Sequence, residues 1–168
     1  MKGGMVAEMP YADFQCMLDD PPGHRNYWSA EYLSGFPDEA VARYCDSVAD
    51  MVVPSPSMHA VFPLGGVLSE PTGWPVPWRG APWAVHPFGV WTDPADDARG
   101  RAWAHSVREA VMPWSIGAVY LNFIGDEGAD RVVAGYGEEN YRRLVEVKRS
   151  WDPGNLFHHN HNIDPHAA

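Results

Sequence analysis

The chain has 168 residues, of which 45% are hydrophobic and 12% aromatic, so it can bury one ordinary domain core and is not a disordered chain. Its 12 basic and 22 acidic residues give a formal charge of −10, which argues against nucleic acid as a partner because the phosphate backbone is itself negative. No run of about 18 apolar residues is present, so the sequence predicts no membrane span.

The cysteine content indicates a reducing compartment. Cys16 and Cys45 are too far apart for a C-x-x-C metal motif, and they suit free thiols, with a single disulfide between them as the alternative. The opening stretch, MKGGMVAEMPYADF, lacks the apolar segment of a secretion signal. We therefore expect a cytoplasmic protein.

The first half of the chain predicts short elements separated by turns. Residues 1–35 are rich in Pro, Gly and aromatics and favour only short helices, such as 11–18. Residues 37–53 predict an amphipathic helix, because Pro37 suits the first helical position and apolar residues recur at helical spacing. These apolar residues are Val41, Tyr44, Cys45, Val48 and Val52.

Residues 57–82 predict a hairpin followed by a loop. Strands are expected over 58–64 and 67–69, joined by a turn at Gly65 and Gly66. The stretch PTGWPVPWRGAP, residues 71–82, predicts irregular structure because proline lacks the N–H that a helix or a ladder needs.

The second half alternates strands and helices. Residues 83–91 and 116–124 predict strands, and 137–151 predict a helix. Thr92-Asp93-Pro94 is typical of a helix start, and that helix should run to about residue 112. This order predicts an α+β fold with an antiparallel sheet, helices packed on one face, and a C-terminal helical extension.

The closing stretch carries a set of motifs at fixed offsets. They comprise Tyr120, Asn122 and Phe123; Tyr136-Gly137 and Asn140-Tyr141; Leu144 and Lys148; Trp151-Asp152-Pro153, Asn155 and Phe157; and Asn160, Asn162 and Ile163. Together they resemble the C-terminal signature of berberine-bridge-enzyme-like, FAD-linked oxidases. Phe123 departs from the signature, which usually has a second Tyr at this position.

The resemblance continues upstream with shorter motifs: Arg25-Asn26-Tyr27-Trp28, Pro63-Leu64-Gly65-Gly66 and Trp91-Thr92-Asp93-Pro94. It implies that residues 1–117 are the C-terminal part of the substrate-binding domain and that 118–168 are the berberine-bridge-type C-terminal segment. Such oxidases hold FAD mainly in an N-terminal domain with a Gly-rich pyrophosphate loop. This sequence shows no such loop, so we expect the FAD-binding domain to be absent or to be a separate partner.

The resemblance implies a function. A small organic substrate would be oxidised by hydride transfer to FAD, with oxygen as the acceptor that regenerates the flavin. Tyr120 is the candidate base, although an unperturbed phenol has a pKa of about 10 and needs a suitable neighbour. On an alternating strand Tyr120 and Asn122 share a face, and Asn122, Asn160 and Asn162 are the candidate cofactor-binding residues. No metal is expected.

Each of these assignments has an alternative. Tyr120 can serve packing alone, and Asn160 and Asn162 can serve turns, because Asn tolerates left-handed backbone. The whole chain can be an inactive truncated fragment, or a small ligand- or metal-binding module that uses its histidine-rich tail. Three further groups are candidates for lining a pocket, with structural roles as the simpler explanation: His59 and His86 on predicted strands, and Trp74, Trp78 and Trp83 around the Pro-rich loop.

Overall fold

The computed structural model describes residues 8–16, 19, 22–70, 73 and 75–167. Within these residues the centre is an antiparallel sheet of four strands: β1 (Arg25–Trp28), β2 (Glu31–Leu33), β3 (Met58–Pro63) and β4 (Trp83–Trp91). β4 is the middle strand, because β1 and β2 pair in succession along one of its edges and β3 pairs along the other.

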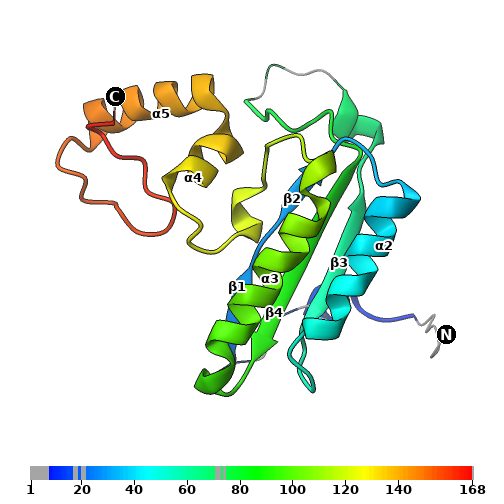
Figure 1. The fold of residues 1–168 in the computed structure, drawn as a ribbon. Coiled ribbons are helices and arrows are strands. Elements are labelled where there is room, and N and C mark those ends of the chain that lie inside the picture. The colour runs from blue at the N-terminus through cyan, green and yellow to red at the C-terminus, as the bar shows by residue number, and fades with distance from the viewer. Residues whose placement is uncertain (1–7, 17–18, 20–21, 71–72, 74, 168) are drawn as a thin grey trace.

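Apart from one short helix near the N-terminus, the described α-helices fall into two groups (Figure 1). α2 (Asp38–Asp46) and α3 (Asp97–Val111) lie on one face of the sheet. α4 (Ala129–Tyr136) and α5 (Glu138–Trp151) stand beside the sheet, and the short α1 (Tyr11–Gln15) lies near the N-terminus. The predicted α+β class, with an antiparallel sheet, helices on one face and a C-terminal helical extension, is therefore confirmed.

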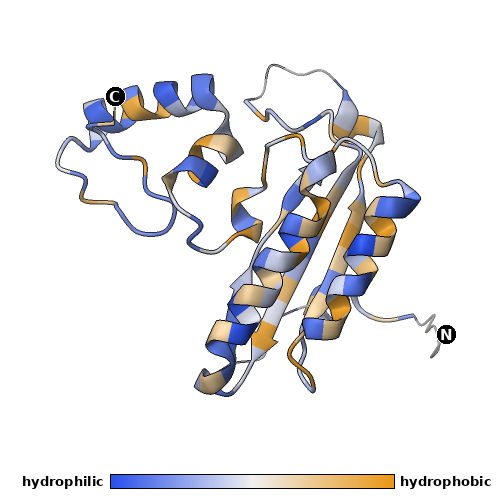
Figure 2. Cartoon of the chain, in the orientation of Figure 1, coloured by the Kyte–Doolittle hydropathy of each residue, from blue (hydrophilic) through white to orange (hydrophobic). Residues whose placement is uncertain are grey.

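Alternation along β4 decides which side chains meet the helices. Val85 and Trp91 point to the helical face, where they pack in one core with Trp103 and Val107 of α3. Close approach of α3 to the strand requires a glycine, since a Cβ on Gly100 would lie 2.3 Å from the Trp91 ring. In Figure 2 the apolar colouring gathers where α2 and α3 meet the strands, whereas α5 is largely hydrophilic.

Several predicted elements form near their predicted bounds. The helix expected over 37–53 ends as α2 at Asp46 and continues as a 3-10 turn, Ser47–Asp50. The strand at 83–91 is β4, and the Asp93 carboxylate accepts a hydrogen bond from the backbone N–H of Ala95 at the predicted helix start. α1 occupies part of the predicted helix at 11–18, of which residues 17 and 18 lie outside the described residues.

Two predicted strands are wrong. Gly66 takes a left-handed φ of 59°, and the chain from Gly66 to Ser69 winds into a 3-10 turn instead of returning as a strand. The stretch 116–124 runs beside β2 only briefly, with backbone bonds from Ile116 N to Tyr32 O and from Tyr32 N to Ala118 O. It then closes into a second 3-10 turn, Leu121–Phe123, because tertiary packing overrides its β-favouring residues.

Sequence reasoning missed β1, β2 and α4. The two strands are short, and Ser29-Ala30 interrupts them, so their alternation spans too few residues to stand out. α4 contains Gly135, a weak helix former. A Cβ there would meet the Leu121 side chain at 2.5 Å, so the glycine serves close packing against the Leu121–Phe123 turn.

A buried charge cluster ties the C-terminal segment to the sheet. The fully buried carboxylate of Glu31 on β2 pairs with Arg108 of α3 at 3.0 Å and with Arg131 of α4 at 3.2 Å. Arg131 also pairs with Glu127 and donates to the Ala30 carbonyl, while Ser115 donates to Glu31. Removing one partner of a buried pair leaves an uncompensated charge, so this cluster fixes how the segment sits against β2.

Candidate functional site

Tyr120 and Asn122 are brought together by a tight turn. The Phe123 N–H bonds back to the Tyr120 carbonyl at 2.8 Å, which closes the 3-10 turn. The Asn122 Nδ2 then donates to the Tyr120 hydroxyl at 2.7 Å. Asn122 is exposed and Tyr120 is half-buried, so neither is sealed within the chain. The two side chains thus contact each other across a turn, whereas the sequence predicted that they share one face of a strand.

An open cavity of about 600 Å³ lies beside this turn. Asn122 lines it together with Asn160 and His161 of the tail, the segment 152–167 that follows α5. Asn26 and Trp28 of β1 also line it. Its size falls in the range usual for small-molecule and cofactor sites. Three segments distant in sequence therefore present amide and imidazole groups to one space, and β1 was not among the predicted contributors.

The tail is held against the turn by specific contacts. The His161 Nε2 lies 2.9 Å from the Leu121 carbonyl. Asn160 takes a left-handed φ of 60°, and its carbonyl accepts the Asn162 N–H. Asn162 does not line the cavity, but its buried Oδ1 has no hydrogen-bond partner among the described residues. Asn160 thus combines the turn role with a place in the cavity wall.

The tail begins at a capped turn after α5. The Asp152 carboxylate pairs with Lys148, which is the main reason that the pKa of Asp152 is lowered. It also accepts the backbone N–H groups of Leu156 and Phe157, which lower this pKa further. Asn155 has a left-handed φ of 52°. Both residues therefore act as turn-formers, as the Asp-Pro motif suggests.

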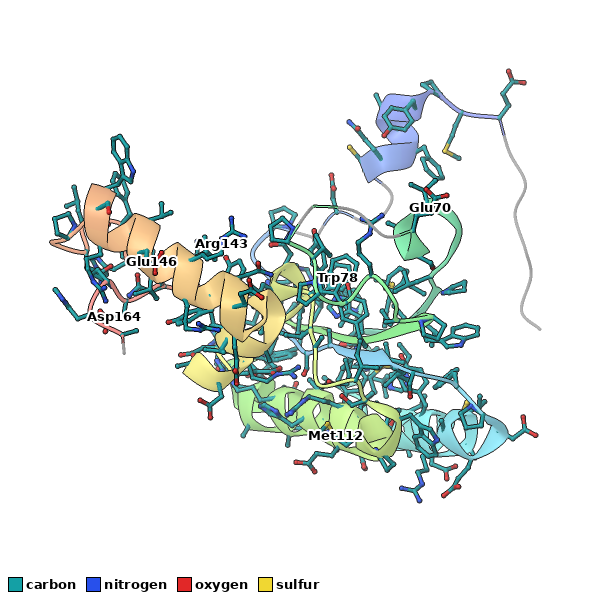
Figure 3. The ribbon with its side chains drawn as sticks, turned by 90° about the horizontal axis from the view of Figure 1, so that it is seen from above. Glu70, Trp78, Met112, Arg143, Glu146 and Asp164 are labelled. Carbon is teal, nitrogen blue, oxygen red and sulfur yellow. The ribbon has the colours of Figure 1, made fainter. Side chains whose placement is uncertain are left out.

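Aromatic rings cover the sheet face opposite α3. Trp28 stacks on Phe88 at 4.6 Å, His86 stacks on Phe123 at 4.3 Å, and Phe123 meets the Tyr120 ring edge-on at 4.8 Å. The layer continues through Trp78, which lies edge-on to Tyr120 and stacks on Tyr32. In Figure 3 Trp78 lies on the side of the sheet away from α3. In the sequence, this aromatic face is indicated by the alternation along β4, which places Ala84, His86 and Phe88 on the same side of the strand.

The two strand histidines point to opposite faces. His59 is half-buried among Tyr44, Trp103 and Ser47 on the helical face, where burial lowers its pKa to about 4. His86 belongs to the aromatic face, where burial lowers its pKa. Of the tryptophans, Trp83 packs against Phe36 at the core, and Trp74 lies outside the described residues.

Among the residues that the structure describes, no group of three or more His, Cys, Asp or Glu side chains is arranged to hold a metal ion. None of the described helices is long and apolar enough to cross a membrane. Cys16 and Cys45 are both free and exposed.

Residues 119–164 match the family described as berberine and berberine-like. The chain is 32% identical over 117 residues to the VAO-type flavoprotein oxidase VAO615 of Thermothelomyces thermophilus, which covers 68% of this chain and 18% of that protein. It is 48% identical over 50 residues to the FAD-linked oxidoreductase fmqD of Aspergillus fumigatus, which covers 29% of this chain and 10% of that protein.

Solved structures show the same likeness over more of the chain. CrmK, a flavoenzyme involved in shunt product recycling in caerulomycin biosynthesis, is similar with a TM-score of 0.71 and 26% identity, over 90% of this chain and 36% of that one. The chain thus spans about a third of this structure and no more than 18% of its curated relatives. The resemblance to berberine-bridge-enzyme-like oxidases is confirmed, and FAD is the cofactor of that family.

Proposed function

We propose that this chain forms the substrate side of a flavin-dependent oxidase site, in which a small organic substrate is oxidised by hydride transfer to FAD and oxygen regenerates the flavin. The observation that carries the proposal is the Tyr120–Asn122 hydrogen bond, at the edge of a cavity that Asn122 shares with Asn160. A cytoplasmic setting is part of the proposal, supported by the free cysteines.

The residues present fit the polar edge of a flavin ring. That edge alternates hydrogen-bond donors and acceptors, and an Asn amide offers both. Asn122 and Asn160 reach the same cavity, and the Asn162 Oδ1 and the Trp28 Nε1 are buried without partners among the described residues. Buried polar atoms are nearly always paired, so the unpaired Nε1 of Trp28, a residue of the cavity wall, supports a missing polar ligand. We assign Asn122, Asn160 and Asn162 to hold the cofactor.

FAD, when bound, supplies the hydride acceptor. The chain must then take the O–H proton of an alcohol substrate as the C–H bond breaks, and we assign this role to Tyr120. The Asn122 amide donates to the Tyr120 oxygen, and a donated hydrogen bond stabilises negative charge on the oxygen that accepts it. The same bond orients the phenol at the edge of the cavity.

The division of the chain belongs to the proposal. We take residues 1–117 as part of a substrate-binding domain and 118–168 as the C-terminal segment, which the family match over 119–164 supports. The partner is an FAD-binding domain, either separate or on the same polypeptide. The competing function is an inactive fragment, in which Tyr120 and Asn122 only stabilise the turn.

Lumiflavin, the bare ring system, tests the proposal on the full chain. NMR titration should shift the side-chain amide signals of Asn122 and Asn160, and Asn122→Ala should weaken binding by about 3- to 10-fold, which corresponds to one hydrogen bond. Asn140→Ala is the matched control, because Asn140 bonds to the Tyr136 carbonyl on α4 and lies outside the cavity. Amide signals that stay in place while lumiflavin saturates would contradict the assignment.

A further inference from the structure

The outer edge of β3 carries unpaired backbone groups. Within the described residues β3 pairs with β4 alone, and in the same register the Leu64 N–H bonds to the Pro82 carbonyl at 2.8 Å. Because successive residues direct their backbone groups to opposite edges of a strand, the even-numbered residues of β3 face β4. The N–H and C=O groups of His59 and Val61 therefore point outward, where they bond to no described residue. Such an edge is a template for another strand.

One flank of α2 is apolar and exposed beside this edge. Tyr44 is buried in the core and donates to the Ala60 carbonyl of β3. The Arg43 guanidinium lies on the α3 side, over the ring of Trp114. Since a helix turns by about 100° per residue, the opposite flank is the one turned away from α3. Its exposed apolar side chains are Val41, Cys45 and Val48.

The layer of helices is wider than the sheet beneath it. β1 and β2 share one edge of β4, so the sheet is three strands wide, or about 14 Å at about 4.8 Å a strand. Two helices side by side, each about 10 Å across, need about 20 Å. α3 packs over β4 through Trp103 and Val107, and Figure 1 shows α2 at the β3 side of the sheet, away from β1. The exposed flank of α2 therefore overhangs the position of a further strand.

A second copy of the chain does not fit this position. Antiparallel pairing of two β3 strands would bring two α2 helices over the same two strands, which offer about 10 Å where the helices need about 20 Å. The occupant is therefore a strand with no helix of its own above it. On the other face of the sheet this strand meets Met58 and Phe62, which are 38% and 39% exposed, so both of its faces contact apolar side chains.

We propose that the outer edge of β3 and the exposed flank of α2 bind an apolar β-strand of the polypeptide that supplies the FAD-binding domain. Backbone bonds to His59 and Val61 would hold the strand, and its alternate side chains would pack beneath Val41, Cys45 and Val48. The matched region covers only 36% of CrmK, so most of that flavoenzyme has no counterpart in this chain and is available to supply the strand. The source of the strand rests on the proposed function, whereas the surface itself does not.

The thiol of Cys45 reports whether the surface is occupied. In the Cys16→Ser chain, a short capped peptide of alternating valine and threonine, with a lysine at each end, should slow the reaction of Cys45 with DTNB. At a peptide concentration of about ten times Kd the rate should fall about 10-fold, because only the free chain reacts. In the Cys45→Ser chain the same peptide should leave the reaction of Cys16 unchanged.

Two N-methylated peptides test the backbone ladder without any change to the fold. His59 and Val61 point to the helical face, so the peptide residues opposite them also point there and present their N–H groups to β3. These are the valines when valine packs beneath α2. N-methylation of the valines should therefore abolish protection of Cys45, whereas N-methylation of the threonines should preserve it.

Four outcomes overturn the inference. Cys45 that reacts at its free rate in about 1 mM peptide has no strand above β3 to protect it, and equal protection by both N-methylated peptides excludes the ladder. Slower reaction at higher chain concentration without peptide would show that a second copy is the occupant. A reactive Cys45 in the chain assembled with its FAD-binding polypeptide would remove that source. The lumiflavin titration is a separate readout, and its failure with intact peptide protection would remove the oxidase proposal and leave a strand-binding surface.

Discussion

At the scale of single residues, the site depends on two contacts that differ in kind. Asn122 donates to the Tyr120 oxygen, whereas the Nδ1 of the buried His86 lies 2.9 Å from the Ser29 backbone carbonyl. The first arrangement suits a group that takes a proton, and the second fixes the orientation of the imidazole against the backbone. These roles are separable by substitution.

Tyr120→Phe tests the base. In the proposed oxidase, assembled with an FAD-binding domain, loss of the phenol oxygen should lower kcat at least about 100-fold, the usual lower range for removing a general base. Flavin absorbance should show that the cofactor remains bound, and initial rates of hydrogen peroxide formation measure the loss. Tyr141→Phe, on α5, is the matched control. A Tyr120→Phe enzyme within about threefold of wild type would exclude the base role.

The lowered pKa of His59 predicts that the folded chain loses stability in weak acid. Its folded-state pKa is about 4 against an ordinary 6.5, so the unfolded chain binds more protons between these values. Stability should be complete above about pH 6.5 and decline as the pH falls toward 4, and the lowered pKa of His86 acts in the same direction. His59→Gln should shrink the decrease in unfolding free energy between pH 7 and 4.5 by about 2 kcal/mol.

Urea unfolding at the two pH values measures this difference. Asp97, with a pKa of about 2, loses its stabilising ionisation only at lower pH. It therefore contributes little to the change in unfolding free energy between pH 7 and 4.5. His158→Gln, at an exposed position, provides the control. An unchanged pH dependence in His59→Gln would show that His59 charges without penalty in the folded chain.

At the scale of elements, α4 supports the Leu121–Phe123 turn by packing closely against the Leu121 side chain. A Cβ on Gly135 would lie 2.5 Å from Leu121, the neighbour of Asn122. Gly135→Ala should therefore cost about 1–3 kcal/mol through overpacking and should move the Asn122 side-chain signal. Gly154→Ala, where a Cβ would meet nothing within 4 Å, should do neither. Denaturation curves and NMR spectra of the two variants make the comparison, and an unmoved Asn122 signal in Gly135→Ala would show that the turn holds itself.

At the scale of the whole molecule, one surface is more apolar than a solvent-facing surface usually is. Val147 and Trp151 of α5, with Leu156 and Phe157 of the following turn, are 56–86% exposed. Contiguous exposed apolar residues usually mark an interaction surface. α5 is otherwise largely hydrophilic (Figure 2), so this end of the helix stands out.

This surface should drive association of the isolated chain. Replacing Trp151, Leu156 and Phe157 with Ser should shift the chain toward monomer in sedimentation velocity, because it removes apolar area from the contact. Val67→Ser with Leu68→Ser changes exposed apolar residues elsewhere and serves as the control. If the control abolishes association as fully as the triple variant, hydrophobicity in general is responsible and not this surface.

The sequence by itself determined a good part of this protein. Periodicity and capping residues located α2, β4, α3 and α5, since these signals are local and repeat over many residues. The fixed offsets from Tyr120 to Ile163 revealed the resemblance to the family that matches residues 119–164, because such motifs are visible directly in the sequence. The same motifs named Asn122 and Asn160, which the fold brings to one cavity.

Only the tertiary structure decided the rest. The β-rich run at 116–124 makes only two backbone bonds to β2 and then closes into a turn, where α4 packs against Leu121. Both partners are distant in sequence, so no local pattern announces these contacts. Trp28, Phe88 and Phe123 are distant in sequence and form one surface only when β1, β4 and the turn assemble. A candidate site made of such long-range contacts has no local pattern, so it is visible only once the chain is folded.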